Sequence, residues 1–168
     1  RHVELVDYAE IWLRLTPGTE AALVNGMINI IINEGWADQE FMEERCEGYD
    51  ALWEVVRKYT PAMVSEITGV PEDKLHAAAE IYANTPRAGI FYTLGITEHT
   101  TGTANVMNLA NLAMVTGHVG VEHAGVNPLR GQNNVQGACD MGALPNVFPG
   151  YRPVNEPENV AIFEKKWG

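Results

Sequence analysis

One arginine stands alone in a charge-poor, amide-rich stretch of this sequence. Arg130 is the only Lys or Arg between Gly117 and Gly142, and Pro, Gly, Gln and Asn residues flank it. A guanidinium donates two parallel hydrogen bonds to a small carboxylate or oxyanion. An arginine removed from water needs an anion beside it. The sequence leaves two anions open: a bound substrate, or an internal carboxylate such as Glu122 or Asp140.

A second candidate site is the turn Thr16-Pro17-Gly18-Thr19-Glu20, which precedes a predicted helix. Free N–H groups at the start of a helix favour an anion, and Gly18 permits close approach of a ligand. Glu20 would repel a phosphate, but its carboxylate can accept hydrogen bonds from the N1–H and amino groups of guanine. The alternative is local: Thr16 or Thr19 caps the helix, and Glu20 interacts with its dipole.

A third polar loop runs from Gly95 to Gly102, directly after a predicted strand, and includes Thr97 and His99. Ligand contacts are expected where a parallel strand ends. His99 is a possible metal ligand, but it lacks the further ligands that a closed metal site requires. A hydrogen-bonding role is therefore favoured for this histidine.

The charge balance restricts the partners of the chain. Its 168 residues carry 22 acidic and 11 basic side chains, for a formal net charge of −11. Phosphate contacts need clustered Lys and Arg, so neither nucleic acid nor an anionic membrane surface is expected as a partner. No apolar run approaches the roughly 18 residues of a membrane span, so no direct membrane insertion is expected. Cys46 and Cys139 are too far apart for a Cys-x-x-Cys motif.

Hydrophobic patterning predicts the elements that position these loops. A strand is expected at residues 11–15, followed by a helix at residues 21–32. A second strand is expected at residues 88–94, followed by a helix at residues 102–116. Gly117 is expected to end the last of these helices. Two such units predict an α/β fold, a Rossmann-like open parallel sheet with helices on both faces. Further helical segments are expected as a surface-exposed crossover or cap at residues 38–46, 50–59, after Pro61 and from Pro71. The core contacts expected for the last of them are Val70, Leu75, Ala78, Ala79 and Tyr82.

Three stretches of the chain carry a resemblance to a known family. Residues 125–142, GVNPLRGQNNVQGACDMG, closely resemble the signature of the catalytic subunit of molybdenum- or tungsten-dependent formate dehydrogenases, which are molybdopterin oxidoreductases. Residues 95–120, GITEHTTGTANVMNLANLAMVTGHVG, are similar to the loop and helix before that signature. Residues 9–20, AEIWLRLTPGTE, are similar to the family pattern Ala-Asp-x-x-Leu-x-Leu-x-Pro-Gly-Thr-Asp, in which Glu20 replaces the usual Asp.

The resemblance implies part of an enzyme that reversibly oxidises formate to CO₂ at a Mo or W centre carried by bis-(molybdopterin guanine dinucleotide). It implies that Arg130 orients formate beside the metal, and that Gly131 and Gln132 line the pterin region. It also implies that two loops contact the cofactor. Their residues are Pro17, Gly18 and Glu20 at a guanosine moiety, and Gly95, Thr97 and His99 on the second loop.

The chain lacks two motifs of that family. Cys139 is followed by Asp140 and Cys46 by Glu47, so neither matches the Cys-His or selenocysteine-His pair that ligates the metal. The four-cysteine motif for an iron–sulfur cluster is also missing. We therefore expect an internal fragment, beginning at Arg1, with no metal ligand of its own and a 4Fe–4S cluster held elsewhere in the parent protein.

The fragment interpretation carries expectations about organisation and partners. Residues 1–131 are expected to be part of the Rossmann-like dinucleotide-binding domain, and residues 132–168 the start of an adjoining lobe. The expected partners are formate or CO₂, the remainder of the catalytic subunit and iron–sulfur electron-transfer subunits. A cytoplasmic location is expected, with the periplasm as the alternative.

Two other functions remain open from the sequence. One is a different molybdopterin oxidoreductase, such as a nitrate-reductase relative that handles another oxyanion. The other is a non-catalytic module that binds a nucleotide or a partner subunit. The run Arg-Gly-Gln-Asn-Asn at residues 130–134 favours formate.

Overall fold

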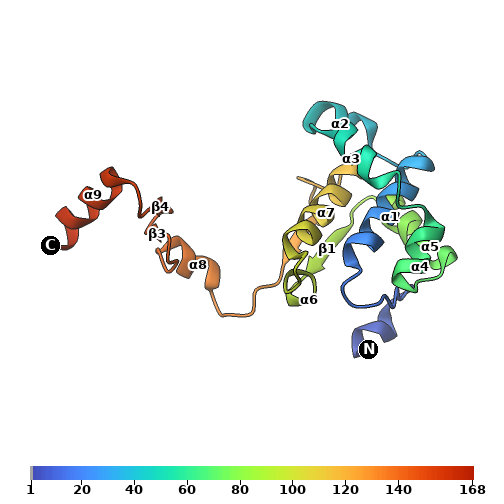
Figure 1. Ribbon diagram of the computed structural model, residues 1–168, viewed down its shortest axis with the longest axis horizontal. Coiled ribbons are helices and arrows are strands. Elements are labelled where there is room, and N and C mark those ends of the chain that lie inside the picture. Colours follow the sequence, from blue (N-terminus) through green and yellow to red (C-terminus); the bar gives the residue numbers. More distant parts are fainter. Residues whose placement is uncertain (1) are drawn as a thin grey trace. The chain divides into compact units, whose positions relative to one another are not determined.

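The computed structural model describes residues 2–168, which form two units (Figure 1). One unit ends at Pro128, and the other is Leu129–Gly168. The first unit contains η1 (Glu4–Tyr8), α1 (Glu20–Asn33), α2 (Gln39–Arg45), α3 (Tyr49–Val56), α4 (Pro61–Thr68), α5 (Glu72–Asn84), β1 (Gly89–Tyr92), α6 (Leu94–Thr97), α7 (Gly102–Val115) and β2 (Gly125–Pro128). From the sequence we expect residues 1–131 and 132–168 to belong to two different lobes of the parent subunit. This expected boundary stays a prediction.

Helix α1 is the centre of the first unit. It packs against α4, α5 and α7, and its residues Ile28 and Ile31 are completely buried. Gly26 lies where α4 crosses α1, and a Cβ added there would meet Val64 Cγ2 at 2.7 Å. Glycine at this position therefore lets the two helices approach closely.

The helices α4 and α5, between α1 and β1, both contribute to the core. Val64 of α4 and Leu75 and Ala79 of α5 are completely buried against the rest of the unit. The core contacts predicted for Leu75 and Ala79 of α5 are therefore confirmed, whereas α4 is more buried than the expected surface-exposed crossover or cap. The apolar faces of α4 and α5 are short. Helix α1 has apolar residues on most of its circumference, so both helices can pack against it.

The sheet of the first unit is parallel, as predicted, and it is small. Strand β1 pairs with β2 in register Gly89 with Gly125 through Tyr92 with Pro128. The strand predicted at residues 11–15 is wrong, because those residues form no strand in the structure. Leu13 and Leu15 instead pack against the core from an extended connection. Their apolar character reflects this packing rather than pairing in a sheet.

Helix α7 follows its prediction at both ends. It spans Gly102–Val115, and the chain leaves it through Gly117, whose φ of 67° lies in the left-handed region. Glycine adopts this conformation without the steric cost of a Cβ. The Gly117 N–H donates to the Met114 carbonyl at 3.1 Å, which closes the last turn.

A buried histidine joins the ends of α5 and α7. The side chain of His118 lies between the two helices; its Nδ1 is 2.8 Å from Thr116 Oγ1, and its Nε2 is 2.9 Å from the Thr85 carbonyl oxygen. Only an N–H can pair with a carbonyl, so Nε2 carries the proton. The ring also meets Tyr82 edge-on at 5.0 Å, and burial raises the pKa of that phenol.

The second unit consists of α8 (Val135–Asp140), β3 (Val147–Phe148), β4 (Arg152–Pro153) and α9 (Pro157–Trp167). Its strands pair antiparallel. Phe148 stacks on Phe163 with ring centroids 4.5 Å apart, and Trp167 packs on Phe163 at 4.7 Å. This aromatic cluster joins the hairpin to α9.

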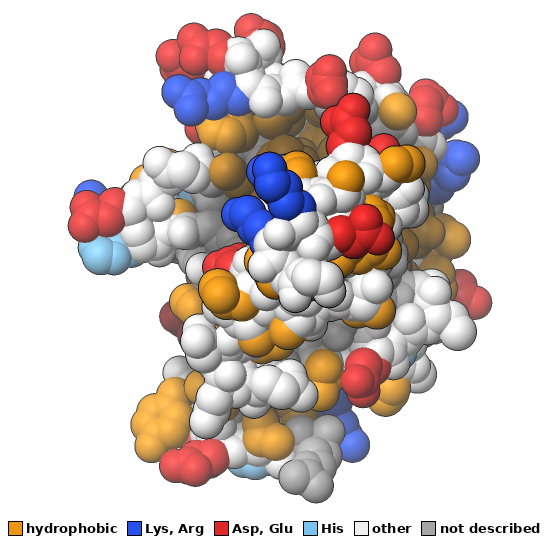
Figure 2. Space-filling view, turned by 90° about the vertical axis from the view of Figure 1, so that its left-hand side faces the viewer, with side chains coloured by type: hydrophobic (Ala, Val, Ile, Leu, Met, Phe, Trp, Pro, Cys, Tyr) orange, Lys and Arg blue, Asp and Glu red, His pale blue; other side chains and the backbone are white. Residues whose placement is uncertain are grey.

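Charged side chains of both signs are interspersed on the face drawn in Figure 2, and acidic ones are frequent along its upper edge. This distribution differs from the clustered Lys and Arg of a phosphate-binding surface. Among the described residues, no helix is long and apolar enough to cross a membrane.

We expect His118→Ala to lower the free energy of unfolding of the chain by about 1–3 kcal/mol, because the Thr85 carbonyl loses its donor. Denaturant unfolding followed by circular dichroism measures this change. His123→Ala is the control, because the His123 side chain is 70% exposed. Equal stability of the two variants would contradict the anchoring role of His118.

Candidate functional site

The turn before α1 is organised around the Glu20 carboxylate. The Gly18 N–H donates to Glu20 Oε1 at 3.1 Å, and Gly18 has a φ of 91°. Thr19 is the N-cap residue of α1, but its hydroxyl donates back to the Thr16 carbonyl at 2.6 Å. Side-chain capping by Thr19, one of the two alternatives, is therefore wrong. The remaining element of that alternative, a carboxylate in the first turn, agrees with the helix dipole.

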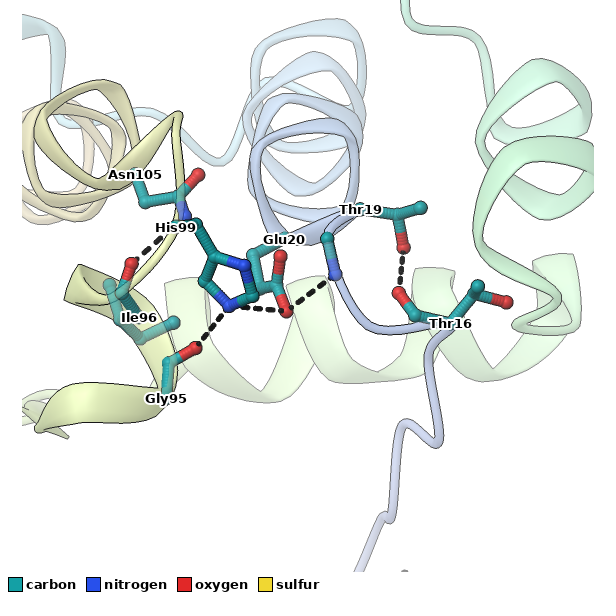
Figure 3. Close-up of polar contacts among 8 residues, drawn as sticks. Thr16, Thr19, Glu20, Gly95, Ile96, His99 and Asn105 are labelled. Atoms are coloured by element: carbon teal, nitrogen blue, oxygen red, sulfur yellow. Dashed lines mark hydrogen bonds and ion pairs between the residues drawn. The ribbon is translucent and has the colours of Figure 1, made fainter.

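The second predicted loop lies beside this turn (Figure 3). It begins with the single turn α6 after β1, and its His99 ring points toward Glu20. His99 Nε2 lies 3.0 Å from the Gly95 carbonyl oxygen and 3.6 Å from Glu20 Oε1. Since a carbonyl accepts only from an N–H, Nε2 carries a proton that also faces the carboxylate. The histidine has the hydrogen-bonding role that the sequence favoured.

Gly102 fixes the path of this loop. A Cβ at Gly102 would lie 2.1 Å from the carbonyl oxygen of Thr97, which is a backbone atom. The Gly102 N–H donates to the His99 carbonyl at 2.9 Å. Helix α7 can begin this close to the loop only because residue 102 has no side chain.

Two buried oxygen atoms near the loops have no hydrogen-bond partner. They are Glu20 Oε2 and Asn105 Oδ1, while the Asn105 amide nitrogen donates to the Ile96 carbonyl at 2.9 Å. The Glu20 side chain is only 12% exposed. An unpaired buried acceptor is costly, and a donor from a ligand would remove that cost. Sequence reasoning missed Asn105, because an asparagine in the first turn of a helix carries no distinguishing signal.

The residues predicted for cofactor and substrate fall in both units. Pro17, Gly18 and Glu20 lie on one loop of the first unit, and Gly95, Thr97 and His99 on the loop beside it. Pro17, Gly18, Gly95 and Thr97 are exposed. Arg130, Gly131 and Gln132 are exposed residues at the start of the second unit.

Within the second unit, Asp140 has another partner. The Tyr151 hydroxyl donates to Asp140 Oδ1 at 2.7 Å and accepts from the Gln136 amide at 3.1 Å. This hydrogen bond raises the pKa of Tyr151. Among the ion pairs of the described residues, none joins Arg130 to Asp140, and Glu122 lies 3.3 Å from His123. The described residues thus show no direct ion pair between Arg130 and Asp140, and the alternative with Glu122, which lies in the other unit, stays a prediction.

The described residues contain no group of three or more His, Cys, Asp or Glu side chains that could hold a metal ion. Cys46 and Cys139 are both free and half-buried. The polar groups that the two loops of the first unit bring together form hydrogen bonds, with the Glu20 carboxylate at their centre.

A family model of the molybdopterin oxidoreductases matches residues 3–166. This match covers nearly the whole chain. The chain belongs to the molybdopterin oxidoreductase family.

Relatives within this molybdopterin oxidoreductase family carry formate dehydrogenase names. The F420-dependent formate dehydrogenase subunit alpha of Methanocaldococcus jannaschii is 52% identical over 159 residues, which is 95% of this chain and 23% of that protein. Formate dehydrogenase H of Escherichia coli is 45% identical over 168 residues, all of this chain and 24% of that protein. The chain thus spans about a quarter of the length of these relatives.

A solved structure supports the fold of the chain. Acetylene hydratase from Pelobacter acetylenicus matches with a TM-score of 0.68 and 35% identity. The match covers 70% of this chain and 16% of that chain. The mixed α/β fold expected from the sequence is therefore confirmed.

We expect Gly102→Ala to destabilise the chain by about 1–3 kcal/mol, because the new methyl group must displace the backbone carbonyl of Thr97. Thermal unfolding measures the loss. Gly95→Ala is the matched control, since a Cβ there meets no atom within 4 Å. A Gly102→Ala protein as stable as Gly95→Ala would contradict the close approach.

Proposed function

We propose that this chain is part of the catalytic subunit of a molybdenum- or tungsten-dependent formate dehydrogenase. The names of its relatives, at 45–52% identity, support this proposal. The parent subunit would oxidise formate reversibly to CO₂ with a bis-(molybdopterin guanine dinucleotide) cofactor. The chemistry that this group supplies when bound is the acceptance of two electrons from formate.

The observation that carries the cofactor part of the proposal is the unpaired oxygen Glu20 Oε2. The other oxygen, Oε1, is already held by the Gly18 N–H and faces His99. The carboxylate is thus fixed in orientation while half of its accepting capacity stays free. Guanine presents two adjacent donors, N1–H and the amino group, and a carboxylate is an acceptor that pairs with them. The residues present therefore fit the guanine end of the cofactor.

The neighbouring backbone also fits a bound group at this point. A Cβ at Gly18 or Gly95 would meet no atom within 4 Å, so the space beside both glycines is open. Pro17 and Thr97 are exposed on the same two loops. In the proposed complex, Gly18 and Gly95 allow the dinucleotide to approach the backbone, and His99 keeps Glu20 in place.

Arg130 is proposed to bind and orient the formate carboxylate. Its guanidinium can form two parallel hydrogen bonds to the two formate oxygens, which leaves the formate C–H free to point away from the arginine. In the described part of the chain Asp140 forms no ion pair with Arg130, and its Oδ1 accepts from Tyr151. Gly131 and Gln132 are proposed to line the pterin beside the substrate; no atom lies within 4 Å of a Cβ built at Gly131.

The remaining parts of the machinery are proposed to lie in the rest of the parent subunit and its partners. These parts are the metal ligand, the 4Fe–4S cluster and the iron–sulfur electron-transfer subunits. The proposed location is cytoplasmic. The likeness to acetylene hydratase, at 35% identity, favours a domain that other family members also use. The substrate is therefore assigned from Arg130 and its flanking residues rather than from the fold.

We expect Arg130→Ala in the parent enzyme to lower kcat/KM for formate by at least about 100-fold, because the substrate loses its orienting charge. The pterin content per subunit stays unchanged. Steady-state assays with a redox dye measure kcat/KM, and chromatography of the pterin released from the denatured enzyme measures the pterin content. Arg87→Ala, at another exposed arginine, serves as the control. Near-normal formate turnover by the Arg130→Ala enzyme would refute the assignment.

We expect Glu20→Gln to lower retention of the guanine dinucleotide cofactor by at least about tenfold, since one charge-assisted hydrogen bond is worth roughly 1.5–3 kcal/mol. The glutamine keeps the size of the side chain but places a donor opposite guanine donors. Nucleotide released from the denatured parent enzyme is quantified by chromatography. Glu34→Gln is the control, because Glu34 is an exposed partner of His76. Full cofactor occupancy in Glu20→Gln would exclude guanine recognition by this carboxylate.

A further inference from the structure

A cavity with a mainly apolar lining and three asparagines lies in the first unit, away from the loops around Glu20. Its volume is about 330 Å³, within the range of binding pockets. Helices α1, α2, α3 and α7 and the α2–α3 connection line it. The lining residues on which the argument depends are Asn25, Cys46, Leu52, Asn108 and Asn111. None of these residues belongs to the site proposed for the cofactor.

Asn25 gives this cavity an unsatisfied acceptor. The residue is only 5% exposed, and its Oδ1 has no hydrogen-bond partner. The next asparagine along the same face of α1 is satisfied, because the Asn29 amide donates to the Val56 carbonyl at 3.0 Å. A buried amide oxygen without a donor costs about 1–3 kcal/mol. A protein that keeps such an atom on a cavity wall gains stability when a donor enters.

The lining residues indicate what kind of ligand would fit the cavity. Asn108 and Asn111 of α7 add two more amides, and α3 contributes the apolar side chains Leu52 and Val55. Asparagine side chains both donate and accept, which matches the alternating N–H and C=O groups of an extended backbone. A helix would offer few such groups, because its own turns use them. Glu47 is the one charged residue of the lining, so an acidic occupant is disfavoured.

We infer that this cavity receives an extended, uncharged segment of the parent subunit that lies outside these 168 residues, with a backbone N–H donated to Asn25 Oδ1 and an apolar side chain against α3. The amount of polypeptide supports this occupant: the chain spans 23–24% of its relatives, so about three quarters of such a subunit lies elsewhere. The inference depends on the chain being part of a longer subunit, as proposed above, but not on formate being the substrate.

Cys46 provides a direct test, because its half-buried thiol lines the cavity. The intact parent subunit is treated with N-ethylmaleimide, and the Cys46 peptide is quantified by mass spectrometry. We expect alkylation at least about tenfold slower than in the urea-unfolded subunit, because the inserted segment must first leave. The reference is the thiol of a Glu54→Cys variant, because Glu54 is an exposed residue of α3 outside the cavity lining. If Cys46 reacts as fast as that reference, the cavity is open and the inference is overturned.

The melting temperature of an Asn25→Leu variant distinguishes a cavity that holds a segment from an empty cavity. Removing an acceptor that has no partner is neutral or stabilising, whereas removing one that holds a donor leaves that donor buried and unpaired. We therefore expect Asn25→Leu to lower the melting temperature of the parent subunit. Met114→Leu, an apolar replacement in the same lining, changes it little. An unchanged or raised melting temperature for Asn25→Leu would overturn the inference. Both readouts are independent of formate turnover, so a wrong substrate assignment would leave them unaffected.

Discussion

The close contact between α1 and α4 determines where the candidate site lies. Gly26 removes the side chain that would otherwise keep Val64 away, so α4 can pack directly on α1. The connection before α1 is then tied to the end of α4, because the Thr16 N–H donates to the Thr68 carbonyl at 2.8 Å. With α1 held in this way, its first turn and the Glu20 carboxylate have a fixed position. The loop after β1 completes the site by bringing His99 to that carboxylate.

The sequence predicted the long elements with strong periodicity. Helices α1 and α7 have apolar residues at helical spacing over several turns, so a single assignment fits them. The strand expected at residues 11–15 failed, because Leu13 and Leu15 are held by the core without a neighbouring strand. Strand β2 was not anticipated. Its sequence, Gly-Val-Asn-Pro, has one β-branched residue and ends in a proline that cannot donate to a ladder.

The candidate site could be predicted in part. The loop after β1 follows from the rule that ligands bind where parallel strands end, and the turn before α1 follows from the free N–H groups of a helix start. The structure brings Glu20 and His99 of these two loops together. The free oxygen of Glu20 could not be foreseen, since it depends on which donors the fold supplies. The role of Arg130 has a different source: its residue type suggests an anion, but the assignment to formate depends on the resemblance of the surrounding sequence. In the second unit, the structure also shows that Asp140 accepts a hydrogen bond from Tyr151.

The short sheet has a consequence for handling the chain. In the described part of the chain, β1 and β2 pair only with each other, so each strand has an outer edge with unpaired N–H and C=O groups. Phe91 of β1 is also 67% exposed. Strand edges of this kind associate with one another in solution. When these 168 residues are expressed by themselves, self-association through β1 would compete with recovery of monomer, and a lysine at an outward position of that strand would be the natural remedy.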